Sequence, residues 1–433
     1  MRAQEDDRAE APRSVRNQVS DVVGPVVQAD HIGTLTLHSA PASAPPPVRP
    51  SRRRRLLRVL VPVAAIGTVS VVLLYAFGVP DGWFGPTAAR SKACLVKVDP
   101  SVKAGYVWAD RPRESSYAPS EPHQCNSTGA VNTVTRASAG RYAVRFPGLG
   151  TDSGTVDVTS ADVNDRVCSV EQWGPAPDDE HDQDVHVVCV DRDGTPADAS
   201  FTASFLFTMG GSGSMAYVRA DKPSSPPYTP DSNHQFNPVG GLNTVEREQE
   251  GTYLVFLPGL HGTPGGMVKV TSLGSTPNAC SPVVWMPWRN PGTGKDFLVV
   301  RVACATLRGV PVDAAFTLSY TVDLGSTADV RIPGAYLWAS ESGAAEYTPM
   351  KDYQYNSTHA LNTVSRTATG TYTVHLPGLV RPGGNPQVSA YNSTATCGVA
   401  GWRPVEHEHQ VEVVCRGAQG EPVDAQFAFL FRQ

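Results

Sequence analysis

The N-terminal part of the chain lacks two residue types that small folded domains rely on. It contains no cysteine before Cys94 and no Phe, Trp or Tyr before Tyr75. Residues 40–50 are instead rich in Pro, Ala and Ser. Such a segment cannot bury enough apolar surface to offset the entropy lost on ordering. We therefore expect residues 1–58 to form a disordered tail.

The chain also lacks the short motifs that mark common catalytic sites. No Gly-x-Ser-x-Gly, His-Glu-x-x-His or phosphate-binding glycine loop occurs in its 433 residues. Acidic and histidine-containing stretches occur at 178–184 and 407–409, but their positions between expected strands favour solvated loops over a metal site. The sequence therefore predicts a protein that is not an enzyme and that holds no cofactor and no metal.

One long uncharged run separates the tail from the rest of the chain. The 21 residues from Val59 to Val79 carry no charge. A helix of about 20 residues, rising about 1.5 Å per residue, crosses a hydrocarbon core of about 30 Å. This predicts a transmembrane helix at 59–79, followed by a linker at 80–93. The alternatives are a cleaved secretory signal, whose basic leader would be unusually long, and a buried core helix, which would lack a helical neighbour.

The charges beside this run predict its orientation. Four consecutive arginines, Arg52 to Arg55, and then Arg58 precede it, whereas only Arg90 and Lys92 follow closely. The positive-inside rule places the N-terminus in the cytoplasm and the C-terminal part outside the cell membrane. All eight cysteines lie in that part, as an oxidising compartment allows. Residues 59–433 hold 26 Lys and Arg against 35 Asp and Glu, a balance that disfavours nucleic acid as a partner.

The exported part contains three copies of one unit, at intervals of 111 and 119 residues. Each copy carries Tyr-x-Pro, then Asn-Thr-Val-x-Arg, then Gly-x-Tyr-x-Val-x-x-Pro-Gly-Leu. A Cys-x-x-x-x-Trp segment, a second cysteine and Gly-x-Pro-x-Asp-Ala-x-Phe follow. Alternating apolar residues that end at Pro-Gly predict strands that end in turns.

This pattern predicts an all-β ectodomain of three tandem immunoglobulin-like β-sandwich repeats, each with about seven strands. The repeats are expected at 94–208, 215–322 and 334–433. We expect the last strand of one repeat, such as Phe316 to Tyr320, to complete the next repeat, which would produce a stiff rod. A single closed threefold assembly of the three units is the alternative.

Repetition selects one disulfide in each unit: Cys168 with Cys189, Cys280 with Cys304, and Cys397 with Cys415. Each would stabilise a small domain by about 3 kcal/mol. Cys125 takes a position that is expected to point inward, and we expect Cys94 to be its partner.

Several polar residues recur in all three copies, namely Arg136, Arg247 and Arg366 with Asp198, Asp313 and Asp424, and also Asn132, Asn243 and Asn362. An enzyme rarely keeps three working copies of one site, so we interpret the arginines and aspartates as structural pairs and the asparagines as turn residues. Glycan binding is the alternative. Trp173, Trp285 and Trp402 are expected to pack against the disulfides, whereas Trp288 stands outside the repeat pattern and is the first candidate for ligand contact.

Within the tail, residues 17–38 alternate β-branched residues with small or polar ones and are charged only at Asp21 and Asp30. Segments of high β-propensity and low charge can stack as in-register strands, with a glutamine such as Gln28 forming a ladder along the fibre. Flanking arginines and prolines keep such a segment soluble until it is templated.

This segment resembles the amyloid signalling motifs of actinobacteria, which are similar to the RIP homotypic interaction motif. The residues that carry the resemblance are Val26, Val27, Gln28, Ala29, Ile32 and Gly33. The resemblance implies that the motif templates a like motif in a cytosolic partner protein. The ectodomain resembles tandem repeats of uncharacterised exported proteins of high-GC bacteria, which supports its location.

The sequence thus predicts a single-pass membrane protein with extracytoplasmic binding repeats and a cytosolic signalling motif. The ligand of the repeats is expected to be a glycan or a protein of the cell envelope. The competing interpretation is a structural or adhesive cell-envelope protein without a signalling role.

Overall fold

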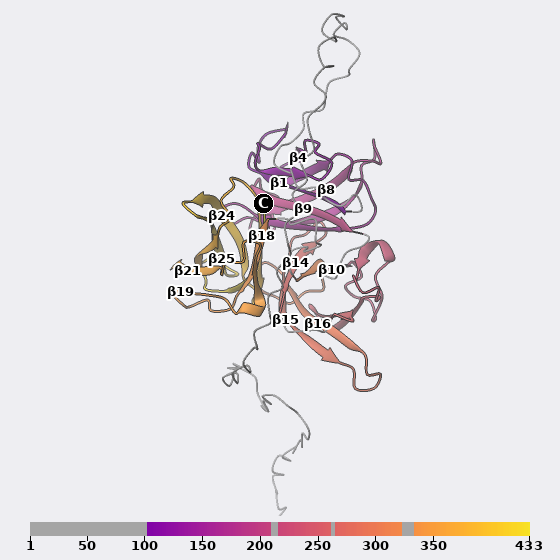
Figure 1. Ribbon diagram of the computed structural model, residues 1–433. Coiled ribbons are helices and arrows are strands. Elements are labelled where there is room, and N and C mark those ends of the chain that lie inside the picture. The colour runs from indigo at the N-terminus through magenta and orange to yellow at the C-terminus, as the bar shows by residue number, and fades with distance from the viewer. Residues whose placement is uncertain (1–101, 209–214, 261–264, 323–332) are drawn as a thin grey trace, which may run out of the picture. The chain divides into compact units, whose positions relative to one another are not determined.

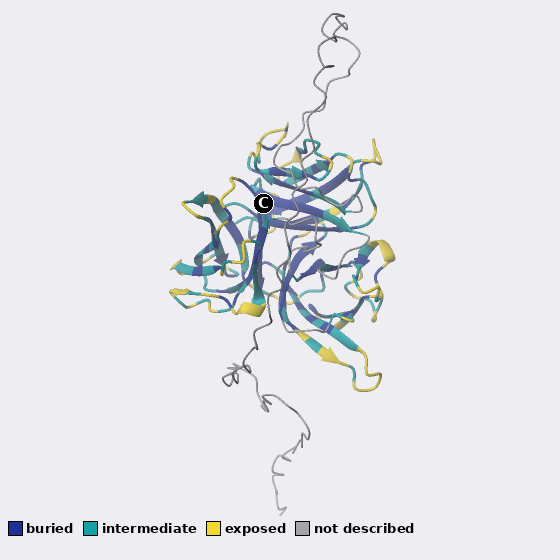
Figure 2. Cartoon of the chain, in the orientation of Figure 1, coloured by how far each residue is buried: buried dark blue, intermediate teal, exposed yellow. Residues whose placement is uncertain are grey.

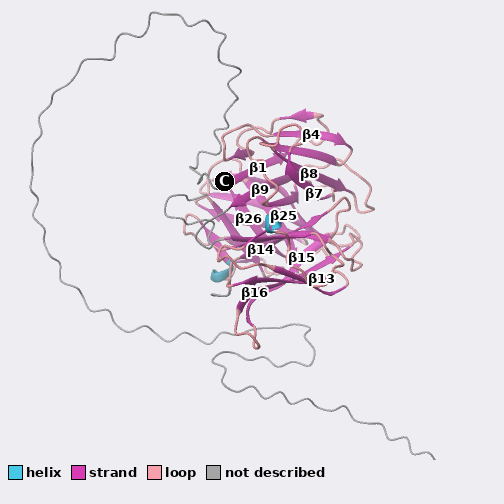
Figure 3. Cartoon of the chain, turned by 90° about the vertical axis from the view of Figure 1, so that its right-hand side faces the viewer, coloured by secondary structure: helices cyan, strands magenta, loops and turns pink. Residues whose placement is uncertain are grey.

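The computed structural model describes residues 102–208, 215–260, 265–322 and 333–433, which we call the head. The head consists of strands and loops with two short 3₁₀ turns, η1 (Ser232–His234) and η3 (Lys351–Tyr353) (Figure 1, Figure 3). The all-β class is therefore confirmed for this part of the chain.

The expected tail, its motif at 17–38, the span at 59–79, the linker at 80–93 and Cys94 lie outside the described residues. Within the described ranges, no helix combines the length and apolar character needed to cross a membrane.

The strands follow the three sequence copies. The first repeat contains β1 (Val102–Ala109), β2 (Ser116–Tyr117), β3 (Gln124–Asn126), β4 (Thr133–Ser138), β5 (Arg141–Phe146), β6 (Thr155–Ser160), β7 (Val167–Pro175), β8 (Gln183–Val190) and β9 (Phe201–Thr208). The second contains β10 (Met215–Ala220), β11 (Gln235–Phe236), β12 (Thr244–Gln249), β13 (Thr252–Pro258), β14 (Met267–Leu273), β15 (Ala279–Arg289), β16 (Asp296–Ala305) and β17 (Ala315–Thr321). The third contains β18 (Gly334–Ala339), β19 (Glu346–Tyr347), β20 (Gln354–Asn356), β21 (Thr363–Ala368), β22 (Thr371–Pro377), β23 (Asn385–Tyr391), β24 (Thr396–Val405), β25 (Glu408–Arg416) and β26 (Gln426–Arg432).

Each repeat has two sheets around an apolar core, as a β-sandwich does. The inner sheet holds the first and last strands, in the orders β3-β1-β9-β6, β11-β10-β17-β14 and β20-β18-β26-β23. The outer sheet runs β2-β4-β5-β8-β7, β12-β13-β16-β15 and β19-β21-β22-β25-β24. The described repeats hold eight or nine strands rather than the expected seven, because two- and three-residue segments such as β2 and β3 also pair.

Alternating side chains explain why these segments form sandwiches. In β5, Tyr142, Val144 and Phe146 are buried while the residues between them are partly exposed, as expected for a strand with one face on the core. The following Pro-Gly turn places Gly148 at a φ of 76°, which a residue with a Cβ rarely adopts. The buried strand faces in Figure 2 therefore come directly from the period-two pattern of the sequence.

The three expected disulfides are confirmed. Cys168–Cys189, Cys280–Cys304 and Cys397–Cys415 each join the two neighbouring strands of a hairpin in the outer sheet. Cys125 is also disulfide-bonded. It is partly exposed between the buried Gln124 and Asn126, so the expectation that it points inward is wrong: in β3 the polar residues face the repeat's interior, where they form a hydrogen-bonded cluster.

The expected sharing of strands between repeats is wrong. β17 pairs with β10 and β14 of its own repeat, and β18 pairs with β26 rather than with β17. The last strand lies antiparallel beside the first strand of the same repeat, and the only pairing between repeats in the described residues is a single bridge from β14 to β7, which joins two sheets into one of nine strands. The physical basis for a rod of overlapping repeats is therefore absent from the described residues.

Instead, each repeat contacts both others. The Thr159 hydroxyl of the first repeat accepts from Val388 N of the third at 3.0 Å. The Ser389 hydroxyl of the third donates to Val270 O of the second at 2.8 Å. A parallel bridge between Leu273 and Val170 joins the second repeat to the first. The contacts close into a ring, which favours the alternative of one threefold assembly.

The strands β6, β14 and β23 occupy equivalent positions and meet where the three repeats join, so we call them the axial strands. Their buried residues include many hydroxyls, among them Thr159, Thr271 and Ser389. Hydroxyls of the neighbouring last strands also reach across, since Thr202 donates to Pro386 O at 2.8 Å and Thr317 donates to Val156 O at 3.0 Å. The head therefore has three apolar cores inside its repeats, and between the repeats it has a polar centre and two smaller apolar clusters, one around Met267 and Leu430 and one around Val190 and Leu307.

In two places, residues at equivalent positions of the three repeats come together and differ in charge. Asp157, Lys269 and Gln387 occupy the same position of the three axial strands and are all buried. Lys269 Nζ lies 4.0 Å from Asp157 Oδ1 and donates to Thr271 Oγ1 at 3.1 Å. We call these three residues the axial triad.

The turns after the outer-sheet hairpins repeat the pattern. Arg308 of the second repeat is paired with Asp193 of the first and donates to Gln419 of the third at 3.3 Å. These are again equivalent positions, each just before the glycine of its turn. The axial triad and this set of turn residues both have an acid in the first repeat, a base in the second and a glutamine in the third.

Candidate functional site

The repeated arginines and aspartates form one structural corner in each repeat. Arg136 Nε lies 2.9 Å from Asp198 Oδ1, and the matching pairs are Arg247 with Asp313 and Arg366 with Asp424. Each aspartate also accepts from a turn backbone N–H and from a tyrosine hydroxyl, as Asp198 does from Gly140 and Tyr142. The guanidinium of Arg136 holds the pKa of Asp198 below its usual range. A carboxylate bound on three sides fixes a turn and leaves little capacity for chemistry.

The repeated asparagines are buried in a second structural cluster. Asn132 donates to Cys125 O at 2.9 Å and accepts from Asn126 Nδ2 at 3.0 Å. Its backbone N–H donates to Gln124 Oε1 at 2.8 Å. The same contacts surround Asn243 and Asn362. These amides are fully buried, so their contacts lie inside the repeats rather than on a glycan-binding surface.

The acidic stretch at 178–184 is a loop only as far as Asp182, because Gln183 and Asp184 begin β8 and are buried, so the expectation of a solvated loop is wrong for these two residues. Its carboxylates bind a side chain of their own repeat. Arg145 contacts Asp178 Oδ1 at 2.6 Å and Asp184 Oδ1 at 2.8 Å, and Asp182 accepts from Gly148 N at 2.9 Å. Across the described ranges, no group of three or more His, Cys, Asp and Glu side chains is arranged to hold a metal ion.

The expectation of a solvated loop at 407–409 is wrong for His409. This residue lies in β25 and is fully buried against Phe431. Burial lowers the pKa of His409 to about 4, and His123 of the first repeat acts in the same direction.

Acid is therefore expected to destabilise the head through His409. The unfolded chain takes up a proton at about pH 6.5, whereas the buried ring resists protonation down to about pH 4. The free energy of unfolding should fall across this window as the pH drops, by about 3 kcal/mol. Urea denaturation of wild type and His409→Leu between pH 7 and 4 measures this. Leu298 occupies the equivalent position of the second repeat, and an unchanged pH slope in the variant would contradict the assignment.

The tryptophans that follow the cysteines lie at the junctions between repeats. Trp173 and Trp285 belong to the same apolar core clusters as the cysteines Cys168 and Cys304. They also reach the opening strand of the next repeat, because Arg219 lies 4.4 Å over the Trp173 ring and Trp338 lies 5.8 Å from Trp285.

The third junction closes the ring. Trp402 of the last repeat lies 4.6 Å from Trp108 of the first. This spatial pairing of the post-cysteine tryptophan with the next opening strand was missed by sequence reasoning, although both positions recur in every copy.

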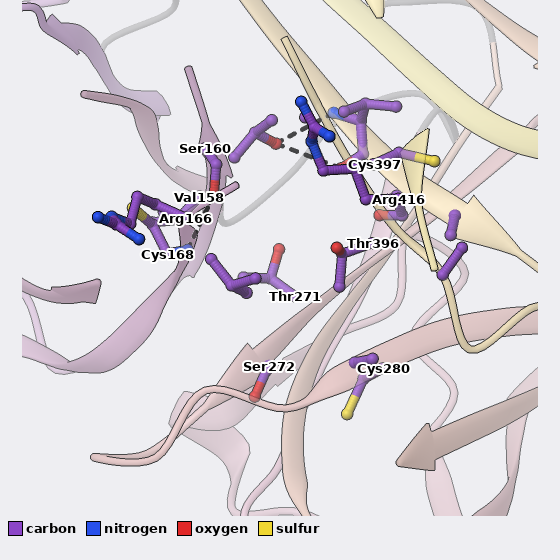
Figure 4. A pocket seen from close by; sticks show the side chains of 18 of the residues that line it. Val158, Ser160, Arg166, Cys168, Thr271, Ser272, Cys280, Thr396, Cys397 and Arg416 are labelled. Carbon is purple, nitrogen blue, oxygen red and sulfur yellow. Dashed lines mark hydrogen bonds between the residues drawn. The ribbon is translucent and has the colours of Figure 1, made fainter. Parts of the chain in front are cut away.

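A small cavity of about 80 Å³ lies at one end of the axial strands and is lined by all three repeats. Figure 4 shows Cys168, Cys280 and Cys397 on different sides of it. Arg192 at its rim donates to Asp165 at 2.7 Å and to Thr396 of the third repeat at 2.6 Å. A cavity of this size holds about two or three waters, so it serves the junction rather than a larger ligand.

The outer sheet of the second repeat presents a different kind of surface. Phe256, Val299 and Met286 are in register across β13, β16 and β15, and Pro258, Phe297 and Trp288 form the next row. Met286 is 48% and Trp288 38% exposed, and the Trp288 ring lies against the rings of Phe256 and Phe297. We call these six residues the apolar face.

Four of the six positions are polar or charged in at least one sister repeat, whereas Pro258 and Trp288 correspond to Pro377 and Val405 in the third. The row equivalent to Phe256, Val299 and Met286 is Arg145, Asp184 and Gly174 in the first repeat and His375, Gln410 and Arg403 in the third. The fold therefore does not require apolar residues here. Because an exposed apolar patch costs solubility, its presence in one of three equivalent places points to binding.

Compared with known proteins, the chain matches no family model, no curated protein and no solved structure. The site must therefore be interpreted from its own chemistry. Of the residues singled out from the sequence, the repeated arginines, aspartates and asparagines make structural contacts inside their own repeats. Trp288 is the one that lies on an exposed surface with other unpaired apolar side chains. Its neighbours were missed because Phe256 and Phe297 look like ordinary strand residues in the sequence.

Proposed function

We propose that this chain is a single-pass membrane protein whose extracytoplasmic head binds a component of the cell envelope through the apolar face. The observation that carries the proposal is that Phe256, Val299 and Phe297 of one outer sheet stand where the third repeat has His375, Gln410 and Glu408, and that Met286 and Trp288 beside them are exposed. Aromatic residues and methionine are typical of binding surfaces. The head is proposed to bind without catalysing a reaction.

The remaining parts of the proposal come from the sequence. The run at 59–79 would cross the cell membrane once, with the tail in the cytoplasm. The motif around Gln28 would recruit a cytosolic protein that carries a like motif. The two-sheet repeats support an immunoglobulin-like class for the sandwiches, but their disulfides join neighbouring strands of one sheet and not the two sheets.

Binding of the purified region 81–433 to isolated cell envelopes tests the role of the head. This region forms one compact unit that contains every described strand. Wild type is expected to sediment with envelopes, and Met286→Ser/Trp288→Ser is expected to lose at least tenfold in affinity. The matched control is Met350→Ser/Leu361→Ser, which replaces two apolar residues of the third repeat that are at least as exposed. Equal binding by all three proteins would reject the apolar face.

The tail is tested separately, because the alternative of an adhesive protein predicts no templating. A peptide of residues 17–38 should form fibres when seeded, and changes at Gln28 and Ile32 should abolish both seeding and partner recruitment. A peptide that stays monomeric under seeding would favour the purely structural or adhesive protein.

A further inference from the structure

The apolar face continues onto the end of a projecting hairpin. β15 and β16 run beyond the body of the second repeat, and Figure 2 shows their tip as exposed. We define the tip as residues 289–296. Trp288 lies directly before it and Phe297 directly after it. The neighbouring loop adds Val239 and Leu242, which are 55% and 66% exposed.

These side chains form one continuous stripe. Pro258 pairs with Phe297 on one side. On the other side its ring lies beside Gly241, and the next residue, Gly259, adjoins the Val239 side chain. The stripe thus runs from Trp288 through Phe297 and Pro258 to Val239 in the neighbouring loop.

The charges at this tip are basic. Arg289 is 72% exposed, and its Nη1 lies 3.8 Å from Asp296 Oδ1, a loose contact. Lys295 is also exposed. The corresponding loop of the first repeat, residues 176–182, contains four carboxylates, and that of the third contains Glu406, with Glu408 at the start of β25. Of the three described hairpin ends, the one with apolar residues is thus also the one with cations.

We infer that the tip of the β15–β16 hairpin docks onto the outer leaflet of the membrane that anchors the chain. Tryptophan with aliphatic and aromatic neighbours favours the lipid–water interface, and nearby Arg and Lys favour anionic headgroups. The acidic ends of the other hairpins would be repelled. The inference rests on the proposed function, because it identifies the envelope component as lipid.

The length of chain before the head makes this contact reachable. The 22 residues from 80 to 101 separate the proposed span from β1, and fully extended they reach about 75 Å at most. A tether of this length keeps the head at high effective concentration beside the bilayer. A modest interfacial affinity is then sufficient, since the span already supplies the permanent anchor.

Flotation with lipid vesicles tests the inference independently of the span. The region 81–433 is mixed with vesicles of phosphatidylcholine alone or with one third phosphatidylglycerol. Wild type should float with the anionic vesicles, and Met286→Ser/Trp288→Ser should lower the partition coefficient at least tenfold. Arg289→Gln/Lys295→Gln should lower it about tenfold on anionic vesicles and leave neutral ones unaffected. Met350→Ser/Leu361→Ser should behave as wild type.

The full chain, reconstituted in the same vesicles, provides the second arm. Backbone hydrogen exchange of residues 284–299 should slow several-fold in anionic vesicles relative to detergent, and the double serine variant should abolish the difference. No vesicle binding by the region and no protection in the full chain would overturn the inference. Self-association that disappears in the serine variant would do so too, because the apolar face would then pair with a second copy.

The two tests separate this inference from the proposed function. Binding to isolated envelopes without binding to pure lipid would reject the lipid contact and retain an envelope ligand. A full chain that fails to insert would reject the span, while flotation of the region would still decide whether the tip binds lipid.

Discussion

Replacing Lys269 with methionine should lower the free energy of unfolding of the head by about 3–5 kcal/mol, since it removes one partner of a buried ion pair. Lys269 is 1% and Asp157 5% exposed in the side chain, so water cannot stabilise the carboxylate that remains. Burial lowers the pKa of Lys269, and the Asp157 carboxylate acts in the opposite direction. Urea denaturation of the region 81–433 measures the loss.

The sister repeat supplies the matched control for this prediction. Gln387 occupies the equivalent position and is buried without a charge, so a neutral amide fits the axis. The double variant Asp157→Asn/Lys269→Gln should therefore cost less than half as much as Lys269→Met alone. A single variant as stable as wild type, or a double variant as unstable as the single one, would show that the pair is not coupled.

Replacing Trp285 with alanine should cost about 3–5 kcal/mol, because it empties a junction between two repeats. Its ring is 4% exposed and lies within 6 Å of the rings of Trp338, Tyr353 and Tyr391. Its Nε1 donates to Gly265 O at 3.1 Å. The cavity would lie between the second and third repeats, so the thermal transition should broaden or split as the repeats lose their cooperativity.

Trp288 provides the control on the same strand. It lies on the opposite side of β15 from Trp285 and is partly exposed, so Trp288→Ala should cost less than about 1 kcal/mol. The two variants thus separate the two roles: one should lose stability and keep envelope binding, while the other should keep stability and lose binding. Similar losses of stability in both would contradict the division of this strand into a structural and a binding side.

Repetition explains which structural features could be predicted from the sequence. Cys280 and Cys304 recur in every copy, so their pairing follows from counting. Arg247 and Asp313 recur in the same way and meet in the same way. Residues that interact inside a repeat recur at the same positions in all three copies. Comparison of the copies therefore detects them without knowledge of the fold.

The contacts between repeats depend on what differs among the copies. Asp157, Lys269 and Gln387 look like three unrelated substitutions at one strand position, and nothing in the sequence shows that they meet. Met286 and Trp288 likewise look like variation in a strand. Their significance depends on which side of the outer sheet faces solvent, and the sandwich decides this.

The sequence by itself determined the all-β class, the three repeats, their disulfides and their Arg–Asp corners, because each depends on residues close together within one repeated unit. Only the tertiary structure decided that the repeats close around a polar centre instead of forming a rod, and that one outer face is apolar. The closed arrangement and the exposed outer face both depend on strand pairing. Pairing places the first and last strands of each repeat in one inner sheet, with one face on the repeat's own core and the opposite face toward the neighbouring repeats.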